Sequence, residues 1–193
     1  MKRILIVAAM LCCTIPAFAQ TPKVEIFGGY SFNRQGSQNL NKGWIGSVTG
    51  NFNKWFGIEG DVSGQYWSED VSVVTGGTVA TGTGTLDILT FRAGPKFSLR
   101  SEDSPVTPFA HVLIGGARMT VGGSTNAGGS TVSVSQGANG IAGLAGGGID
   151  IGKGPVAVRM QVDYSVFNIS DLFGLSGTSN GVRASAGIVF RIR

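Results

Sequence analysis

Residues 156–166 read V-A-V-R-M-Q-V-D-Y-S-V, and apolar side chains alternate with small or polar ones over the whole stretch. The apolar set consists of Val156, Val158, Met160, Val162, Tyr164 and Val166. The other set contains Arg159 and Asp163, one full charge of each sign. Because successive side chains of a strand point to opposite faces, the stretch predicts a strand between two different media. A shift of its register by one residue would bury both charges.

Seven further segments alternate in the same way, with varying clarity. They span residues 24–32, 44–52, 56–66, 89–97, 108–120, 140–151 and 182–192. The segments 108–120 and 140–151 are rich in Gly and apolar on both faces, so the pattern does not orient them. The total is eight strands, an even number.

The connections between these segments alternate in kind. Tight turns are predicted at 53–55 and 152–155, whereas the connections 68–84, 121–139 and 167–180 are long and rich in Gly, Ser, Thr and Asn. Short turns at one end and long loops at the other are typical of an up-and-down meander. The connections 35–42 and 98–107 fit this alternation less well. We expect residues 75–85 and 122–140 to be low-complexity tips with little fixed structure.

The N-terminus has the three parts of a secretory signal. Basic Lys2 and Arg3 precede an apolar run over residues 4–11 and a small-residue site at Ala17-Phe18-Ala19. We therefore expect residues 1–19 to be cleaved and residues 20–193 to form one domain. Both cysteines, Cys12 and Cys13, fall inside the signal, so the exported chain has no disulfide framework and no cysteine metal site.

Composition argues against an ordinary soluble protein. Charged residues make up 13% of the chain, whereas soluble domains average about 25%. The chain also contains 32 Gly, and no apolar stretch after the signal approaches the ~20 residues of a helical span. Loss of Lys2 and Arg3 lowers the formal charge from +4 to +2, which does not indicate nucleic-acid binding.

Two features decide which face of the strands is wet. The polar faces are mostly Gly, Ser, Thr and Ala, and their few charges can be paired: Glu25, Glu59, Asp61, Asp150 and Asp163 with Arg92, Lys96, Arg159, Arg183 and Arg191. This composition suits a narrow enclosed lumen. Aromatic side chains gather toward strand ends, as in the interfacial girdles of membrane barrels: Tyr30, Phe32, Trp44, Phe52, Trp55, Phe56, Tyr66, Trp67, Phe97 and Tyr164.

The last strand resembles the signal by which outer-membrane barrels are recognised for assembly. That signal has a polar residue, a Gly and two hydrophobic positions two apart, represented here by Ser185, Gly187, Phe190 and Ile192. The chain departs from the commonest form because it ends in Arg193 instead of an aromatic residue.

The chain from residue 20 onward resembles the eight-stranded outer-membrane β-barrel family related to the membrane domain of OmpA. The resemblance is carried by Gly57-Ile58-Glu59-Gly60-Asp61, Gly94-Pro95-Lys96, Pro108-Phe109-Ala110, Gly146-Gly147-Gly148-Ile149-Asp150, Arg159 with Gln161, Asp163 and Tyr164, and the final strand. It implies an all-β, eight-stranded antiparallel up-and-down transmembrane barrel in the bacterial outer membrane. The implied partners are outer-membrane lipid, lipopolysaccharide and the barrel assembly machinery.

The candidate site is a polar network in the lumen. It comprises Glu25, Glu59, Asp61, Arg92, Lys96, His111, Asp150, Arg159, Gln161, Asp163 and Arg183. In a functional interpretation, Glu59 and Asp61 line an ion path or form a gate with Arg92. In a structural interpretation, the charges pair inside a barrel that eight strands make too narrow for open water. The polar faces as a whole, with Arg191 included, carry five charges of each sign, which favours the structural interpretation because a selective pore carries an excess of one sign.

The sequence offers no catalytic, cofactor or metal site. His111 is the only histidine and has no nearby Ser on its face and no second His, so we expect a lumen-facing His bonded to a strand neighbour. The Gly146-Gly147-Gly148 run is followed by neither a Lys-Ser/Thr pair nor a helix, which favours strand packing over a phosphate loop.

We predict a monomeric, non-enzymatic outer-membrane barrel with periplasmic termini and a structural or cell-surface interaction role, in which the long loops could contact an extracellular ligand. One alternative is a small pore or lateral channel for small or hydrophobic solutes. A second alternative is a soluble periplasmic ligand-binding barrel, which requires an apolar interior and solvent-accessible Glu59, Arg92, Arg159 and Asp163.

Overall fold

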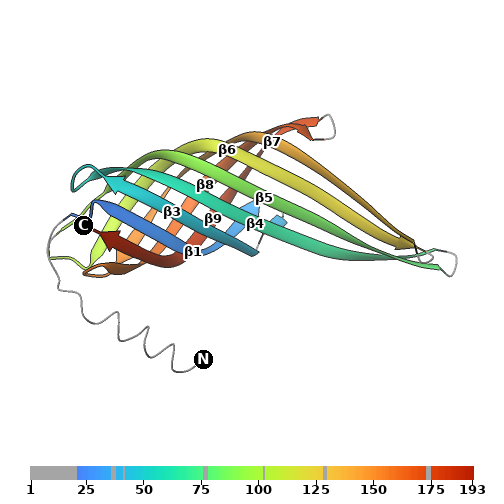
Figure 1. The fold of residues 1–193 in the computed structure, drawn as a ribbon, viewed down its shortest axis with the longest axis horizontal. Helices are drawn as coiled ribbons and strands as arrows, with labels where there is room; N and C mark the ends of the chain where they lie inside the picture. The colour runs from blue at the N-terminus through green and yellow to red at the C-terminus, as the bar shows by residue number, and fades with distance from the viewer. Residues whose placement is uncertain are drawn as a thin grey trace, which may run out of the picture.

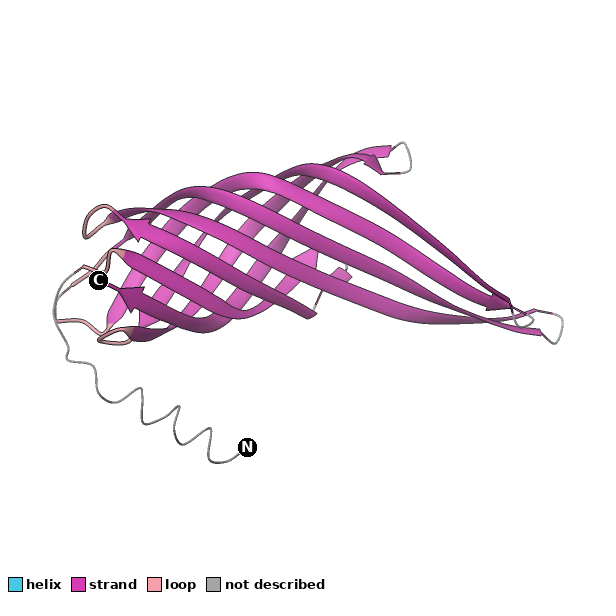
Figure 2. Ribbon diagram, viewed as in Figure 1, coloured by secondary structure: helices cyan, strands magenta, loops and turns pink. Residues whose placement is uncertain are grey.

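The computed structural model describes residues 21–35, 38–40, 42–75, 78–101, 103–127, 130–172 and 175–193. These residues form strands joined by turns and loops (Figure 2). The strands are β1 (Val24–Gln35), β2 (Gln38–Leu40), β3 (Lys42–Asn51), β4 (Phe56–Thr75), β5 (Thr78–Ser98), β6 (Val106–Ala127), β7 (Ser130–Ile151), β8 (Val156–Leu172) and β9 (Leu175–Ile192). No helix among the described residues is long and apolar enough to cross a membrane.

Eight long strands form a closed antiparallel barrel. Strands β1 and β3 to β9 each pair with the next in chain order, and β1 pairs with β9 to close the sheet. Among the described residues, the short β2 pairs with the end of β1 alone, through Asn33, Arg34 and Gln35. The predicted all-β, eight-stranded meander is therefore confirmed.

The strands are staggered around the barrel. A register line that starts at Gln35 returns to β1 at Glu25, ten residues lower, after one circuit. It passes through Gly181, Ser165, Leu144, Leu113, Gly94, Glu59 and Thr49, where Leu113 and Gly94 lie between the ladder pairs Ile114–Ala93 and His111–Lys96. A stagger of this size tilts the strands by about 40° from the barrel axis. Side chains from distant segments therefore meet inside the barrel.

The alternation of the sequence separates the two faces as predicted. In β8, Val158, Met160 and Val162 are exposed on the outside, whereas Arg159 and Asp163 are buried inside. The two segments that the sequence left unoriented also follow this rule: Leu113 and Leu144 are buried, and Val112, Ile114 and Ile141 are exposed. The soluble ligand-binding alternative is wrong, because the charges lie inside and the outer surface is apolar.

The short turns and the C-terminus lie at one end of the barrel, which we call the turn end (Figure 1). Asn53 stabilises its turn because its side-chain oxygen accepts hydrogen bonds from the backbone N–H groups of Trp55 and Phe56, at 2.9 and 2.8 Å. In the 152–155 turn, Gly152 and Gly154 have φ angles of 154° and 142°, which disfavour any residue with a Cβ. Both predicted turns are confirmed.

The opposite end, which we call the hairpin end, differs from the prediction. Residues 75–85 and 122–140 were expected to be irregular tips, but β4, β5, β6 and β7 continue far beyond the end of β3 (Figure 1). Ladder pairs join β4 to β5 as far as Thr75–Thr78 and β6 to β7 as far as Ala127–Ser130. Because β5 also pairs with β6, the strand ends at residues 67–75, 78–86, 119–127 and 130–138 form one four-stranded sheet, which we call the protruding sheet. Thr and Val favour strands, and here they outweigh the Gly content that suggested loops.

Aromatic side chains mark two levels of the outer surface. At the turn end, Trp55, Phe56 and Phe97 stack with centroid separations of 5.5 to 6.1 Å. Toward the hairpin end, the Trp44 indole N–H donates a 3.2 Å hydrogen bond to the Tyr66 hydroxyl. Ten residues of tilted strand separate Phe56 from Tyr66, which corresponds to about 25 Å along the axis, the height of the apolar band of a membrane barrel.

Candidate functional site: the polar interior of the barrel

The barrel interior combines a charged centre with apolar layers. Toward the hairpin end, Ile88, Ala117, Ala138, Ala142 and Phe167 form a buried apolar cluster. Toward the turn end, a second cluster contains Phe27, Ile45, Ala157 and Val189. All eleven residues of the predicted lumen network lie inside the barrel and are at least 95% buried.

One group of charges surrounds Glu25 near the turn end. Its carboxylate accepts hydrogen bonds from Lys96 Nζ at 3.3 Å and from Arg159 Nη2 at 3.3 Å. Arg159 also donates two bonds, of 2.7 and 2.9 Å, to Asp150, its ladder partner on β7. The Arg159 guanidinium lies over the Phe109 ring at 4.6 Å, which gives this cation an aromatic contact as well.

A second group joins opposite walls. Arg92 donates to its ladder partner Asp61 at 3.0 and 2.7 Å. Arg183 on β9 donates to its ladder partner Asp163 at 2.9 and 2.8 Å and also reaches Asp61 on β4 at 3.0 Å. Strands β9 and β4 are not neighbours, so Arg183 ties together two walls of the barrel.

His111 connects the two groups and corrects one prediction. Its Nδ1 lies 3.1 Å from Glu59 on β4, and its Nε2 lies 2.9 Å from Asp163 on β8. Neither strand neighbours β6, so the expected bond to a strand neighbour is wrong. The narrow lumen brings strands two positions apart within reach of an imidazole. A His donates to two carboxylates at once only in its doubly protonated form.

The proposed gate of Glu59 and Asp61 with Arg92 splits in two. Asp61 binds Arg92, whereas the recorded partners of Glu59 are His111, Lys96 and Arg159, at 3.1, 3.6 and 3.8 Å. Gln161 completes the network with a 3.1 Å bond to Asp163. Glu59 and Asp61 therefore each have buried partners of their own, an arrangement that holds the charges in place.

Sequence reasoning missed several members of the network. Arg100 follows the end of β5 and donates a 2.6 Å bond to Glu25, but it lies in a connection where alternation gives no signal. Gln65 Nε2 donates to Ser31 Oγ at 2.8 Å, and Ser63 and Thr90 share a 2.8 Å bond. These uncharged residues are on the polar face of their strands, and that position was the only available signal.

The four assembly-signal residues lie on β9 beside the closing strand. Ser185 is buried, whereas Phe190 and Ile192 are exposed on the outer face. Gly187 sits against β1 so closely that a Cβ there would collide with the carbonyl oxygen of Gly28. The glycine is thus required by the seam itself, whatever the assembly machinery recognises.

The described residues contain no group of three or more His, Cys, Asp or Glu arranged to hold a metal ion. Glu59, His111 and Asp163 do meet, but the two imidazole nitrogens point at different carboxylates and so share no common ligand position. The carboxylates also have arginine or lysine partners, which occupy the lone pairs that a metal would need.

Comparisons with known proteins give the following similarities. The family model described as outer membrane protein beta-barrel domain matches residues 5–190. No curated protein matches the chain.

Among solved structures, Ail, the attachment invasion locus protein of Yersinia pestis, is 16% identical with a TM-score of 0.51, covering 89% of this chain and 100% of Ail. The same protein in complex with the heparin analogue sucrose octasulfate gives 18% identity and a TM-score of 0.52, covering 86% and 96%. Neisserial surface protein A is 16% identical with a TM-score of 0.48, and the match covers 88% of this chain and 96% of that protein. At these identities the likeness concerns the fold.

Proposed function

The chain belongs to the outer membrane protein beta-barrel domain family, and from that premise we propose that it is a sealed, non-enzymatic anchor that displays the protruding sheet at the cell surface. In this proposal residues 1–19 direct export, the turn end faces the periplasm and the hairpin end faces outward. The interior network acts as packing that closes the lumen.

The protruding sheet is the observation that carries the proposal. Alternation gives it one largely apolar face that continues the lumen side. On this face Trp67, Leu86 and Met119 pack against the buried apolar cluster, Val134 lies beyond them, and the exposed Glu69 and Gln136 are the polar exceptions. The other face is polar, with residues such as Thr81 and Ser135. Val134 is 62% exposed although it lies on the apolar face. An uncovered apolar face outside the membrane is typical of an interaction surface.

The sheet also has a free edge. Strand β7 pairs with β8 only from Asn139 onward, so among the described residues 130–138 have ladder partners on the β6 side alone. These residues contain no charge and no Pro, the usual devices that prevent edge pairing. We therefore propose that the sheet binds an extended polypeptide that adds a strand to β7 and places alternate apolar side chains on the apolar face.

Sulfated polyanions are a poorer fit to this surface, even though a heparin analogue binds Ail. The charged residues of the protruding sheet include Glu69 and Asp70, which would repel a polyanion. Recognition through the sheet edge needs no charge, because the ladder hydrogen bonds come from the backbone.

Panning of a phage-displayed peptide library against the protein in lipid nanodiscs tests this function. We expect enriched peptides with apolar residues at alternate positions, and loss of their binding in Val134→Arg, which places a charge on the edge strand. Thr81→Arg, on the polar face of the interior strand β5, is the matched control and should retain binding. Equal binding by both variants, or no enrichment, contradicts the proposal.

The filled interior of the barrel argues against the pore alternative. Bulky side chains that include Arg159, Arg183 and Phe27 are fully buried across the lumen. Planar-bilayer recordings should show no conductance above the lipid background, and a reproducible unitary conductance would favour the pore.

A further inference from the structure

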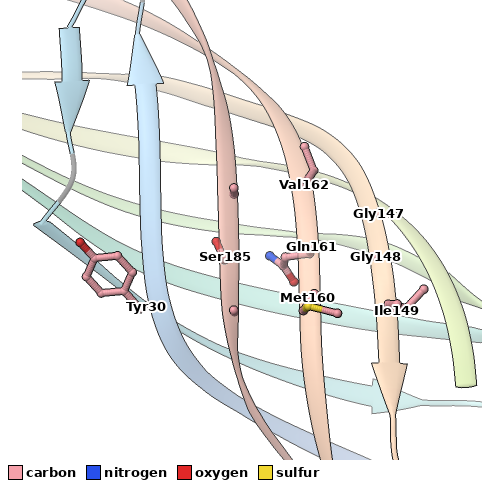
Figure 3. A pocket seen from close by; sticks show the side chains of 10 residues that line it. Tyr30, Gly147, Gly148, Ile149, Met160, Gln161, Val162 and Ser185 are labelled. Carbon is pink, nitrogen blue, oxygen red and sulfur yellow. The ribbon is translucent and has the colours of Figure 1, made fainter. Parts of the chain in front are cut away.

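An apolar groove crosses β9 and β8 on the outside of the barrel, from Tyr30 on β1 to Gly147 and Ile149 on β7 (Figure 3). Its volume is about 390 Å³, and its floor is formed by the small side chains Ala184 and Ala186. Tyr30 of β1 stands at one end, Met160 and Val162 of β8 lie next to the alanines, and Ile149 of β7 stands at the other end. The groove exists because β9 carries alanine where its neighbours carry large side chains.

The register gives the groove a direction. Ala186 pairs with Tyr30 and Met160, and Ala184 pairs with Phe32 and Val162. One step further toward the hairpin end, Val182 pairs with Arg34 on β1 and Tyr164 on β8. Beyond the hairpin-end edge of the groove, the next outward positions are therefore the exposed Arg34 on β1 and Tyr164 on β8, neither of which lines the groove.

The depth of the groove defines its surroundings. Tyr30 pairs with Trp44 of the aromatic level near the hairpin end, and Ala184 and Ala186 lie on the turn-end side of Arg34. In a membrane barrel such aromatics mark the level of the lipid headgroups. The groove is thus within the outer leaflet, and Arg34 is at headgroup height.

We propose that this groove binds one acyl chain of an outer-leaflet lipid whose phosphate pairs with Arg34. An acyl chain is the apolar occupant that the surrounding bilayer supplies, and the groove is open to that bilayer. The charge of Arg34, beyond the hairpin-end edge of the groove, complements a lipid phosphate, because arginine donors suit phosphate oxygens. The inference rests on the proposed outward orientation of the hairpin end, but not on the function of the protruding sheet.

Native mass spectrometry of the detergent-solubilised protein, titrated with lipid A, tests the proposal. Ala184→Phe fills the groove and displaces two or three methylene contacts, so we expect about tenfold weaker binding. Arg34→Ala removes one cation at headgroup height, and we expect binding to weaken about fivefold. All variants should keep the heat-dependent gel shift of a folded barrel, since Ala184 and Arg34 are exposed.

Two matched variants separate a site from general lipid adhesion. Ala93→Phe makes the same change at an exposed alanine of β5, on the opposite side of the barrel, and Arg118→Ala removes an exposed arginine on β6. Both should bind lipid A within about twofold of the unmodified protein. Equal effects of the Ala184→Phe and Ala93→Phe changes overturn the proposal.

A second copy of the chain is the competing occupant. If Ala184→Phe abolishes a dimer in the lipid-free spectrum and leaves lipid A binding unchanged, the groove is a contact between copies and the lipid proposal is wrong. Failure of peptide binding to the protruding sheet would not affect any of these outcomes.

Discussion

The barrel body and the protruding sheet share strands β4 to β7. In both, polar and apolar side chains alternate, but the apolar side chains are on opposite faces. In the body, the inward face is charged and buried and the outward face is apolar, as at Asp163 and Val162 of β8. In the protruding sheet, the face that continues the lumen is largely apolar, as at Val134, although Glu69 shares it, and the other face carries Ser and Thr. Strand β7 shows the reversal within one strand: exposed Ile141 is on the outward face of the body, whereas Val134 is on the lumen-side face of the sheet and Ser135 on the other. We take this reversal as the level at which the apolar medium outside the barrel ends.

The seam of the body should be the most sensitive point. Gly187→Val places side-chain atoms against the Gly28 carbonyl, so the barrel cannot close without moving β1. We expect a loss of at least about 4 kcal/mol, seen as disappearance of the heat-shifted folded band on a gel. Gly177→Val on the same strand is the control, because no atom lies within 4 Å of its Cβ position. Normal folding of Gly187→Val would contradict the tight seam.

Removal of a buried charge should come next. Asp163→Ala leaves His111 and Arg183 without an acceptor that both use, and we expect about 3 to 5 kcal/mol of destabilisation in urea titrations of the protein in vesicles. Asp70→Ala in the protruding sheet removes an exposed acceptor of Thr83 and should cost no more than about 0.5 kcal/mol. Similar losses for the two variants would remove the distinction between the regions.

Replacing each of two similarly exposed valines by arginine tests whether that position faces lipid or water. Val162 is 58% exposed and Val134 is 62% exposed. Val162→Arg should destabilise the barrel by about 2 to 4 kcal/mol because the new arginine faces lipid. Val134→Arg places its arginine in water and should leave the free energy of unfolding almost unchanged. Chemical denaturation of both variants in the same vesicles gives the comparison, and a large loss in the Val134→Arg variant would place the sheet inside the bilayer.

The smallest expected effect is at the aromatic level between the two regions. Trp44→Phe keeps an aromatic ring but removes the indole N–H that bonds to Tyr66. We expect about 0.5 to 1.5 kcal/mol of destabilisation by the same titration. Tyr66→Phe removes the other partner of the same bond, so the double variant should add little, and full additivity would show that the bond contributes nothing.

Much of the body could be predicted because its signal is local. The alternation in residues 156–166 gave the strand, its two faces and the burial of Arg159 and Asp163 without knowledge of any other strand. The partners of His111 could not be predicted, because they depend on a ten-residue stagger that accumulates over the whole circuit. Arg100 was missed because a residue in a connection has no alternation to place it.

The protruding sheet was missed for a different reason. Its strands are rich in Gly, Ser and Thr, and this composition predicts a loop when each segment is considered by itself. Their ladder becomes favourable only because each segment continues a strand that the barrel has already aligned. The structure therefore shows that composition alone is a poor guide where strands extend from an existing sheet.

Paired labelling from outside the cell tests the central claim most directly. The predicted mature chain has no cysteine, so Ser135→Cys on the protruding sheet and Ser165→Cys inside the barrel can each be probed alone with a membrane-impermeant maleimide on intact cells. Ser165 is 1% exposed. A sealed barrel that displays an open sheet predicts rapid labelling in the Ser135→Cys variant, and labelling in the Ser165→Cys variant only after heat denaturation. Rapid labelling of both variants, or protection of the Ser135→Cys variant, would contradict it.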